Sequence, residues 1–345
     1  MTITVNATQA AAMGPEYLKA NLVPYIKGSP ACGKSSIVRQ IAETYKLKLI
    51  DLRLSQCDPT DLLGFPSINN EKTKAGYVPM EMFPVEGDPI PENYNGWLLF
   101  LDEFNGADSS TQKAAYKLVL DQMVGNHKLH EKCKIIAAGN LATDNALVEE
   151  LSTALQSRFV HMELSTCPKA WAEWAAEANI DHRIMSYIRF KPDMLYTFRP
   201  DHSDCTYGSP RTWEFTSKLL KTIDIDTNPN ALELVTGIVS EGVAREFLSF
   251  CKIYEDLPVF ADIIANPEEM SVPTSPGTLY ALIGSIANNV CMDTVNQVMK
   301  FVNRIPVSLF EFQVVCIQDM TRRNPDMRDA TAIKQWGVNN AADLF

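Results

Sequence analysis

The segment GSPACGKSS, residues 28–36, constrains the fold of this chain more than any other stretch. It lies between the strand-like run LVPYIK and the helix-like run SSIVRQIAETY. A glycine-rich turn between a strand and a helix lets backbone N–H groups and the helix N-terminus surround phosphate groups. The sequence therefore predicts a phosphate-binding loop in an α/β fold. The fixed positions of the pattern G-x-x-x-x-G-K-[ST] are Gly28, Gly33, Lys34 and Ser35.

Every residue of this loop has an expected part in binding a nucleotide. The Lys34 ammonium group is expected to pair with the β and γ phosphates, and the Ser35 hydroxyl to hold Mg²⁺. Cys32 is by default a small filler inside the loop. The predicted cofactors are ATP and Mg²⁺, and the predicted nucleotide-binding residues are Gly28, Ser29, Pro30, Ala31, Cys32, Gly33, Lys34, Ser35 and Ser36.

A second segment, WLLFLDEF at residues 97–104, narrows the class of reaction. Its apolar run leads into Asp102 and Glu103, which places two carboxylates at the carboxyl end of a buried strand, where a parallel sheet presents its ligand site. Asp102 suits the magnesium shell through water, and Glu103 can orient and deprotonate an attacking water. Two acids at this point favour hydrolysis by water, whereas a kinase would need a pocket for a phosphate acceptor.

The order of apolar and helical patterns predicts the fold class. Between residues 21 and 165, short apolar runs alternate with amphipathic helical runs, which indicates a mainly parallel sheet covered by helices on both faces. Residues 58–96 are rich in Pro, Gly and Asn and indicate an insertion of loops with a hairpin. After residue 165, apolar positions recur at helical spacing, as in Val243, Phe247 and Phe250.

We therefore expect an α/β protein in three parts. Residues 1–165 form the parallel-sheet nucleotide-binding core, which includes the insertion at 58–96. Residues 166–225 form a helical lid, and residues 226–345 form a further helical C-terminal extension, divided by Pro-rich breaks.

Composition argues against several classes of function. The net charge of −11 is spread over both halves, with 15 basic and 19 acidic residues up to 165 and 16 basic and 23 acidic residues after it, so neither half has the basic surplus that nucleic-acid binding uses. No run approaches the roughly 18 apolar residues of a membrane span. The scattered cysteines form no C-x-x-C pair or zinc-ligand spacing, which favours reduced thiols and a cytoplasmic location. They are Cys32, Cys57, Cys133, Cys167, Cys205, Cys251, Cys291 and Cys316.

A series of motifs resembles the AAA+ ATPases, and in particular their MoxR branch. The motifs occur in the family's order, as GSPACGKSS, LLFLDEFNGADSSTQKA, IIAAGN, LQSRF and YGSPRTWE, and they cover residues 21 to about 218. The resemblance implies an AAA+ P-loop core with a lid. It assigns Lys34 and Ser35 to Walker A, and Asp102 and Glu103 to Walker B. Asn140 matches sensor 1, and Arg211, at the start of a lid helix, matches sensor 2.

Arg158, in TALQSRFVHMEL, has no acidic residue within four positions. The resemblance places it where AAA+ proteins carry the arginine finger, which acts on the nucleotide of a neighbouring subunit. An ion pair with a distant acid of its own chain is the alternative. The predicted catalytic residues are Glu103, Asn140, Arg158 and Arg211, and the predicted metal-binding residues are Ser35 and Asp102.

The chain departs from the pattern of the MoxR branch that it resembles at two positions. Gly106 follows the D-E-x-N segment where an arginine is usual, and Leu141 follows the sensor asparagine where a proline is frequent. Both changes concern the coupling of hydrolysis to movement. Residues 58–96 match the family's helix 2 insertion, and residues 123–132 read as a hairpin. Candidate client contacts there are Phe65, Tyr77, His127 and Lys128, although the two aromatic rings could instead pack within their own loops.

The resemblance implies a Mg²⁺-dependent ATPase that works as a ring, expected to be a hexamer, and that remodels a protein client or inserts a cofactor or metal. A partner with a von Willebrand factor A domain is an expectation of the same kind. One alternative is a DNA-directed ATPase such as a helicase or helicase loader, for which the best support is the basic stretch TRRNPDMR, residues 321–328. Another is a monomeric nucleotide kinase or switch.

Overall fold

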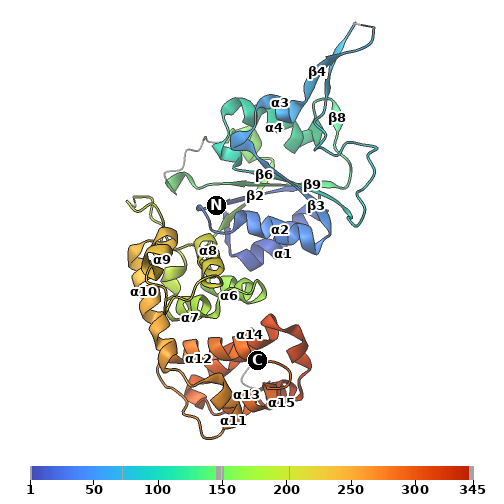
Figure 1. Ribbon diagram of the computed structural model, residues 1–345. Helices are drawn as coiled ribbons and strands as arrows, with labels where there is room; N and C mark the ends of the chain where they lie inside the picture. Colours follow the sequence, from blue (N-terminus) through green and yellow to red (C-terminus); the bar gives the residue numbers. More distant parts are fainter. Residues whose placement is uncertain (1, 72, 145–148, 150, 202, 342–345) are drawn as a thin grey trace. The chain divides into compact units, whose positions relative to one another are not determined.

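The computed structural model describes residues 2–71, 73–144, 149, 151–201 and 203–341, which group into two compact units (Figure 1). The first unit is drawn from residues up to Cys167 together with 199–201. The second unit is drawn from residues 168–198 and from residue 203 onward.

The first unit is built on a central sheet in which the described strands all run parallel. The strands follow the order β1-β10-β2-β9-β6-β3. The sequence predicts all of them except β1, so the expected parallel-sheet class is confirmed. Their bounds are β1 Ile3–Val5, β2 Val23–Gly28, β3 Leu47–Arg53, β6 Gly96–Asp102, β9 Cys133–Gly139 and β10 Phe159–Leu164.

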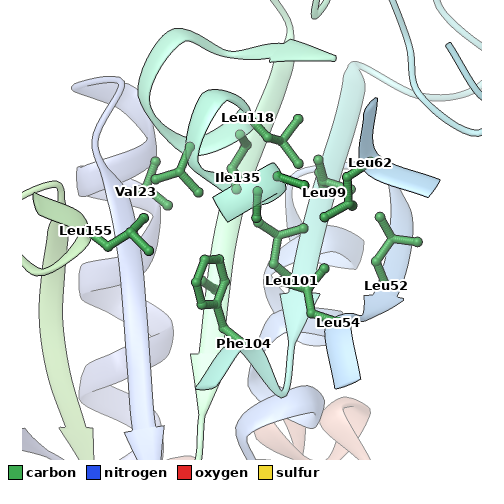
Figure 2. Close-up of a cluster of buried hydrophobic side chains, with 14 of the residues drawn as sticks. Val23, Leu52, Leu54, Leu62, Leu99, Leu101, Phe104, Leu118, Ile135 and Leu155 are labelled. Atoms are coloured by element: carbon green, nitrogen blue, oxygen red, sulfur yellow. The ribbon is translucent and has the colours of Figure 1, made fainter. Parts of the chain in front are cut away.

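Helices cover both faces of this sheet. On one face, Leu98 and Phe100 of β6 pack in one cluster with α1 (Ala7–Lys19) and α2 (Lys34–Thr44). On the other face, Leu99 and Leu101 pack in a cluster with Leu118 of α4 (Ser109–Asp121), as Figure 2 shows. Successive residues of a strand point to opposite faces, so a strand covered on both sides must be apolar throughout.

Strand β1 and helix α1 precede the phosphate loop and are absent from the sequence prediction. β1 pairs with β10, and α1 begins with a capping box in which Asn6 and Gln9 exchange side-chain to backbone bonds. Only Val5 of β1 is buried, so the strand is too short and too polar to give a pattern. α1 contains Pro15, which weakens its helical signal.

The insertion forms a short helix and a two-stranded hairpin. The helix α3 (Pro59–Leu63) is followed by the antiparallel strands β4 (Phe65–Ile68) and β5 (Ala75–Val78). A second antiparallel hairpin, β7 (Met123–Val124) with β8 (His127–Lys128), precedes β9. Both expected hairpins are therefore present.

The regular secondary structure in the described part of the second unit consists of helices, as predicted. One hydrophobic cluster joins α6 and α7 to α8, α9 and α10, and α12 lies between α7 and α14. The division into a lid and an extension at residues 225 and 226 remains a proposal. The helices are α6 Pro168–Glu177, α7 His182–Phe190, α8 Pro210–Leu220, α9 Ala231–Val239, α10 Glu241–Cys251, α11 Phe260–Ala265, α12 Pro276–Asn289, α13 Val295–Val302, α14 Phe310–Arg323 and α15 Thr331–Asn339.

All eight cysteines are free thiols. Burial raises the pKa of the Cys133 thiol to about 12 and also raises the pKa of Cys32. Such thiols stay protonated and serve packing. Among the described helices, none combines the length and apolar character needed to cross a membrane.

Candidate functional site

The phosphate loop connects β2 to α2 in the conformation that its glycines allow. Gly33 precedes α2 with φ of +108°, a left-handed conformation that favours glycine, and Ala31 also has a positive φ of 59°. Lys34 is buried, and its Nζ donates to the carbonyl oxygens of Gly28 at 2.6 Å and Ser29 at 3.1 Å. The ammonium group is thus held inside the loop where phosphate oxygens are expected.

The inner wall of the loop is tightly packed. A Cβ on Gly28 would lie 2.8 Å from Cys32 Sγ and 3.2 Å from the Leu164 carbonyl oxygen, so only glycine fits. Cys32 is buried, as expected of a filler. Ser29, Pro30 and Ala31 are half-buried and Ser36 is exposed.

Ser35 and Asp102 meet at the carboxyl end of the sheet. Ser35 Oγ donates to Asp102 Oδ2 at 3.0 Å, and Asp102 is buried. The other carboxylate oxygen, Oδ1, accepts the backbone N–H of Glu103 at 2.9 Å. A hydroxyl and a carboxylate oxygen on one side suit Mg²⁺, which is usually held by one or two protein oxygens together with waters and substrate phosphates. The two predicted metal-binding residues therefore fit the ion.

Glu103 follows Asp102 in a left-handed backbone conformation, with φ of 52°. Its Oε2 accepts a hydrogen bond from the Ser55 hydroxyl. Ser55 lies just beyond the end of β3, whose last residue Arg53 pairs with Asp102. Sequence reasoning missed Ser55. Its position after a strand adjacent to the acidic strand is the signal that could have found it.

Asn140 completes the group at this edge. Its side-chain Oδ1 accepts from Lys34 Nζ at 3.0 Å. Its backbone is held by Asn105, another residue that sequence reasoning missed. The structure thus brings together five of the predicted site residues from three different segments, namely Lys34, Ser35, Asp102, Glu103 and Asn140.

Arg158 lies at the opposite edge of the sheet from this group. It follows α5 (Thr153–Gln156) and precedes β10, in which Phe159 pairs with Val23 and Leu164 pairs with Gly28. Phe159, at the start of β10, is therefore five residues along the strand from Leu164, which lies beside Gly28 of the phosphate loop. Five residues span about 17 Å at the usual rise per residue of a strand. The Arg158 side chain is exposed and makes no ion pair or hydrogen bond within the described part of the chain. It is not part of the phosphate site of its own chain.

Arg211 belongs to the second unit. It is exposed in the first turn of α8, between Ser209 and Thr212, which form the capping box of this helix. Its expected reach over the phosphates remains a proposal.

The four candidate client contacts lie on the two hairpins. Phe65 is 59% exposed and Tyr77 is 40% exposed, so neither ring is buried in its own loop. His127 Nε2 lies 2.9 Å from the Tyr77 carbonyl oxygen, which ties the second hairpin to the first, and Lys128 is exposed. The β4–β5 hairpin projects from the first unit (Figure 1), and the β7–β8 hairpin contacts it through His127.

Residues 25–159 match the family model described as the AAA domain of the dynein-related subfamily. The match runs from β2 to the start of β10 and includes every site residue of the first unit named above from Gly28 to Arg158. No curated protein sequence matches the chain.

Two solved structures illustrate the similarity at the level of the whole chain. A RuvB mutant from Thermotoga maritima is 17% identical, with 84% of this chain and 81% of that chain covered and a TM-score of 0.36. NtrX from Brucella abortus in complex with ADP is 15% identical, with 90% and 68% covered and a TM-score of 0.40. With TM-scores below 0.5, neither similarity bears on what this chain does.

Proposed function

We propose that the protein, whose residues 25–159 match the family model of the AAA domain, binds ATP with Mg²⁺ and hydrolyses it to ADP and phosphate. The observation that carries this proposal is the meeting of Ser35 with Asp102, beside Glu103 and Asn140. A metal-holding pair, a carboxylate and an amide at the end of a phosphate loop are the parts that phosphoryl transfer to water requires.

The step is an in-line displacement at the γ phosphorus. A water oxygen forms the new bond, its proton passes to the Glu103 carboxylate, and the bond to the bridging oxygen of ADP breaks. Lys34 offers positive charge to the phosphates, and Asn140 can hold the water or the γ phosphate. Arg211 of the same subunit and Arg158 of a neighbour would add positive charge.

Replacing Glu103 by Gln tests the assignment. We expect Glu103→Gln to keep ATP affinity within about threefold and to lose turnover by about 100-fold or more, because the general base is removed. Turnover is measured by phosphate release and affinity by a fluorescent ATP analogue. The matched control is Glu131→Gln, at an exposed carboxylate before β9, which should keep the parent rate. Parent-rate hydrolysis by Glu103→Gln would remove Glu103 from the mechanism.

The same proposal extends to a MoxR-type ring motor. We propose a homo-oligomer, a hexamer by analogy with that branch, whose nucleotide-driven movement remodels a protein client or inserts a cofactor or metal. A partner with a von Willebrand factor A domain belongs to this proposal, as does a cytoplasmic location. The exposure of Arg158, away from its own phosphate loop, supports an arrangement in which it serves another copy.

The two hairpins are the proposed contact with the client. Phe65 and Tyr77 supply exposed rings, and His127 and Lys128 supply polar contacts beside them. Client-stimulated turnover should fall in Phe65→Ala while basal turnover stays within about twofold, since an exposed ring adds little to the fold. Equal stimulation of Phe65→Ala and parent would move the client contact elsewhere.

The alternative of a DNA-directed ATPase loses its best sequence support. Arg322 pairs with Glu173 of α6 at 3.1 Å. Arg323 is half-buried, and it donates to the Ile180 carbonyl oxygen at 2.7 Å. Two of the three basic residues in the stretch are therefore engaged within the second unit and are poorly placed for phosphate contacts.

Measuring ATPase activity with and without single-stranded DNA distinguishes these functions. A DNA-directed ATPase would be stimulated by it with a steep salt dependence, whereas we expect no stimulation. The monomeric kinase or switch predicts a specific activity that does not depend on protein concentration. A ring predicts activity that falls on dilution.

A further inference from the structure

Asn105 connects the acidic strand to the sensor strand. It lies in the short 3₁₀ helix Phe104–Gly106, two residues after Glu103, and its side chain is 7% exposed. Its Nδ2 donates to the Asn140 carbonyl oxygen at 2.8 Å, and its Oδ1 accepts the Asn140 N–H at 2.9 Å. One side-chain amide therefore pairs with both main-chain polar groups of Asn140.

This pairing takes the place of a strand neighbour. β9 ends at Gly139, whose last ladder partner is Lys27 of β2, so Asn140 lies one residue beyond the ladder. Buried main-chain groups that lack a partner cost about 1–3 kcal/mol each. Asn105 supplies both partners and so fixes the direction in which the Asn140 side chain leaves the sheet.

The contact between Asn105 and the end of β9 is closely packed. A Cβ on Gly139 would lie 2.4 Å from Asn105 Oδ1 and 2.1 Å from the Tyr25 hydroxyl. The Asn105 amide oxygen and the Tyr25 hydroxyl therefore both lie at the position where a side chain of residue 139 would begin, so a larger residue at position 139 would displace them. Glycine at position 139 is thus what allows the Asn105 side chain to come this close to the end of β9.

Because its backbone is held, the Asn140 side chain can meet Lys34, whose Nζ donates to Oδ1 at 3.0 Å. Asn105 is also connected to Glu103 along the main chain, with only Phe104 between them. The position of the amide at Asn140 relative to the carboxylate at Glu103 is therefore set through one intervening side chain.

We propose that Asn105 is a positioning residue for ATP hydrolysis, which aligns Asn140 with Glu103 without touching the nucleotide itself. The inference rests on the proposed ATPase function. A displacement of about 1 Å in a group that orients the attack can cost about 100-fold in rate, while binding depends mainly on the phosphate loop. The turnover number kcat should therefore depend on Asn105 far more than ATP affinity does.

The variant Asn105→Asp replaces the donating amide nitrogen by a carboxylate oxygen. It keeps the acceptor for the Asn140 N–H, and it places a carboxylate oxygen against the Asn140 carbonyl oxygen, where two acceptors repel. We expect kcat to fall about 10- to 100-fold and the Kd for ATP to stay within about threefold. The matched control is Gln112→Glu in α4. Gln112 is also a buried amide, whose Nε2 donates to the Ala107 carbonyl oxygen at 3.0 Å, away from Asn140.

Gln112→Glu should lower thermal stability while it leaves kcat within about twofold, since a lost buried hydrogen bond acts on folding. If Asn105→Asp does not fold, Asn105→Ala takes its place, because it removes both bonds without introducing a charge. Either Asn105 variant with unchanged kcat overturns the proposal.

A double-mutant cycle separates positioning from general damage. In the Asn140→Ala background, the amide that Asn105 aligns is already missing, so adding Asn105→Asp should lower kcat by less than about twofold more. A full multiplicative loss would show that Asn105 acts independently of Asn140 and would overturn the inference. If the parent protein itself does not hydrolyse ATP, the proposed function fails. If the parent is active and the cycle is multiplicative, only the role of Asn105 fails.

Discussion

Ser55 shows how single residues beyond the recognised motifs shape the site. Its hydroxyl donates to Glu103 Oε2, and it is exposed at the end of β3. The Glu103 carboxylate must give up the hydrogen bond from Ser55 before this oxygen can accept a proton from the attacking water. Ser55 therefore competes with the water for Glu103.

Replacing Ser55 by Ala should raise basal turnover. A typical hydrogen bond contributes about 0.5–1.5 kcal/mol, so the release of Glu103 corresponds to a gain of about two- to tenfold in kcat. Phosphate release under saturating ATP measures it, and Ser55→Thr, which keeps the hydroxyl, should stay near the parent rate. A fall in turnover of Ser55→Ala would mean that the bond holds Glu103 in its working position.

His182 gives the second unit a pH-dependent stability. Burial lowers the pKa of this imidazole to about 4, although the neighbouring Asp181 carboxylate attracts the proton. The folded pKa lies below the unfolded value of about 6.5, so the unfolded chain takes up the proton first as pH falls. The free energy of unfolding should thus be unaffected by His182 above pH 6.5 and should decrease by up to about 3 kcal/mol between pH 6.5 and 4.

Urea unfolding at several pH values in this window measures the effect. His182→Gln, which carries no titrating group, should flatten the dependence between pH 6.5 and 4. Arg183 stays paired with Asp181 in both proteins, so the pair is a constant background in that window. An identical slope in parent and variant would exclude His182 as its source.

At the scale of elements, a buried ion pair between Arg189 and Asp319 connects α7 to α14. The two terminal guanidinium nitrogens of Arg189 donate to the Asp319 carboxylate, with Nη2 to Oδ1 at 2.6 Å and the other hydrogen bond from Nη1 to Oδ2. Asp319 is 2% exposed and Arg189 is 13% exposed at the side chain. Removing one partner leaves a buried charge without compensation.

Arg189→Met should destabilise the second unit by about 3–5 kcal/mol, because the Asp319 carboxylate would lose its partner in a buried position. Lys334→Met is the matched control. Its partner Asp329 is exposed, and such solvent-screened surface pairs contribute little to stability. Chemical unfolding followed by circular dichroism compares the two. Equal effects would mean that the Arg189 pair is as hydrated as a surface pair.

The elements also show where sequence reasoning succeeds. The apolar runs of β2, β6 and β9 are visible because both faces of each strand are covered, and the loop at Gly33 is visible because its chemistry needs glycine. β1 is too short to give a pattern. The bonds of Ser55 to Glu103 and of Asn105 to Asn140 join separate strand ends, so they depend on strand order, which periodicity does not specify. The pairing of Arg322 with Glu173 depends likewise on how distant helices pack.

At the scale of the whole molecule, the phosphate site and Arg158 lie at opposite edges of one sheet. Arg158 cannot reach the phosphate site of its own chain. In a closed ring, each subunit presents its phosphate site to the neighbouring subunit, so Arg158 could act on the nucleotide bound there. The ring proposal therefore predicts that each active site takes Glu103 from one subunit and Arg158 from the next.

Mixing two inactive variants tests this claim most directly. Arg158→Ala should bind ATP near normally and lose about 10³-fold or more in turnover, as loss of an arginine finger does. Glu103→Gln is expected to be inactive because it lacks the general base. In a 1:1 mixed ring, about a quarter of the sites join an intact Glu103 to an intact Arg158 in a neighbour, so about a quarter of the parent turnover should return. Subunit exchange is verified by energy transfer between labelled copies. No recovery in rings that have exchanged subunits would contradict the account and return Arg158 to a structural role.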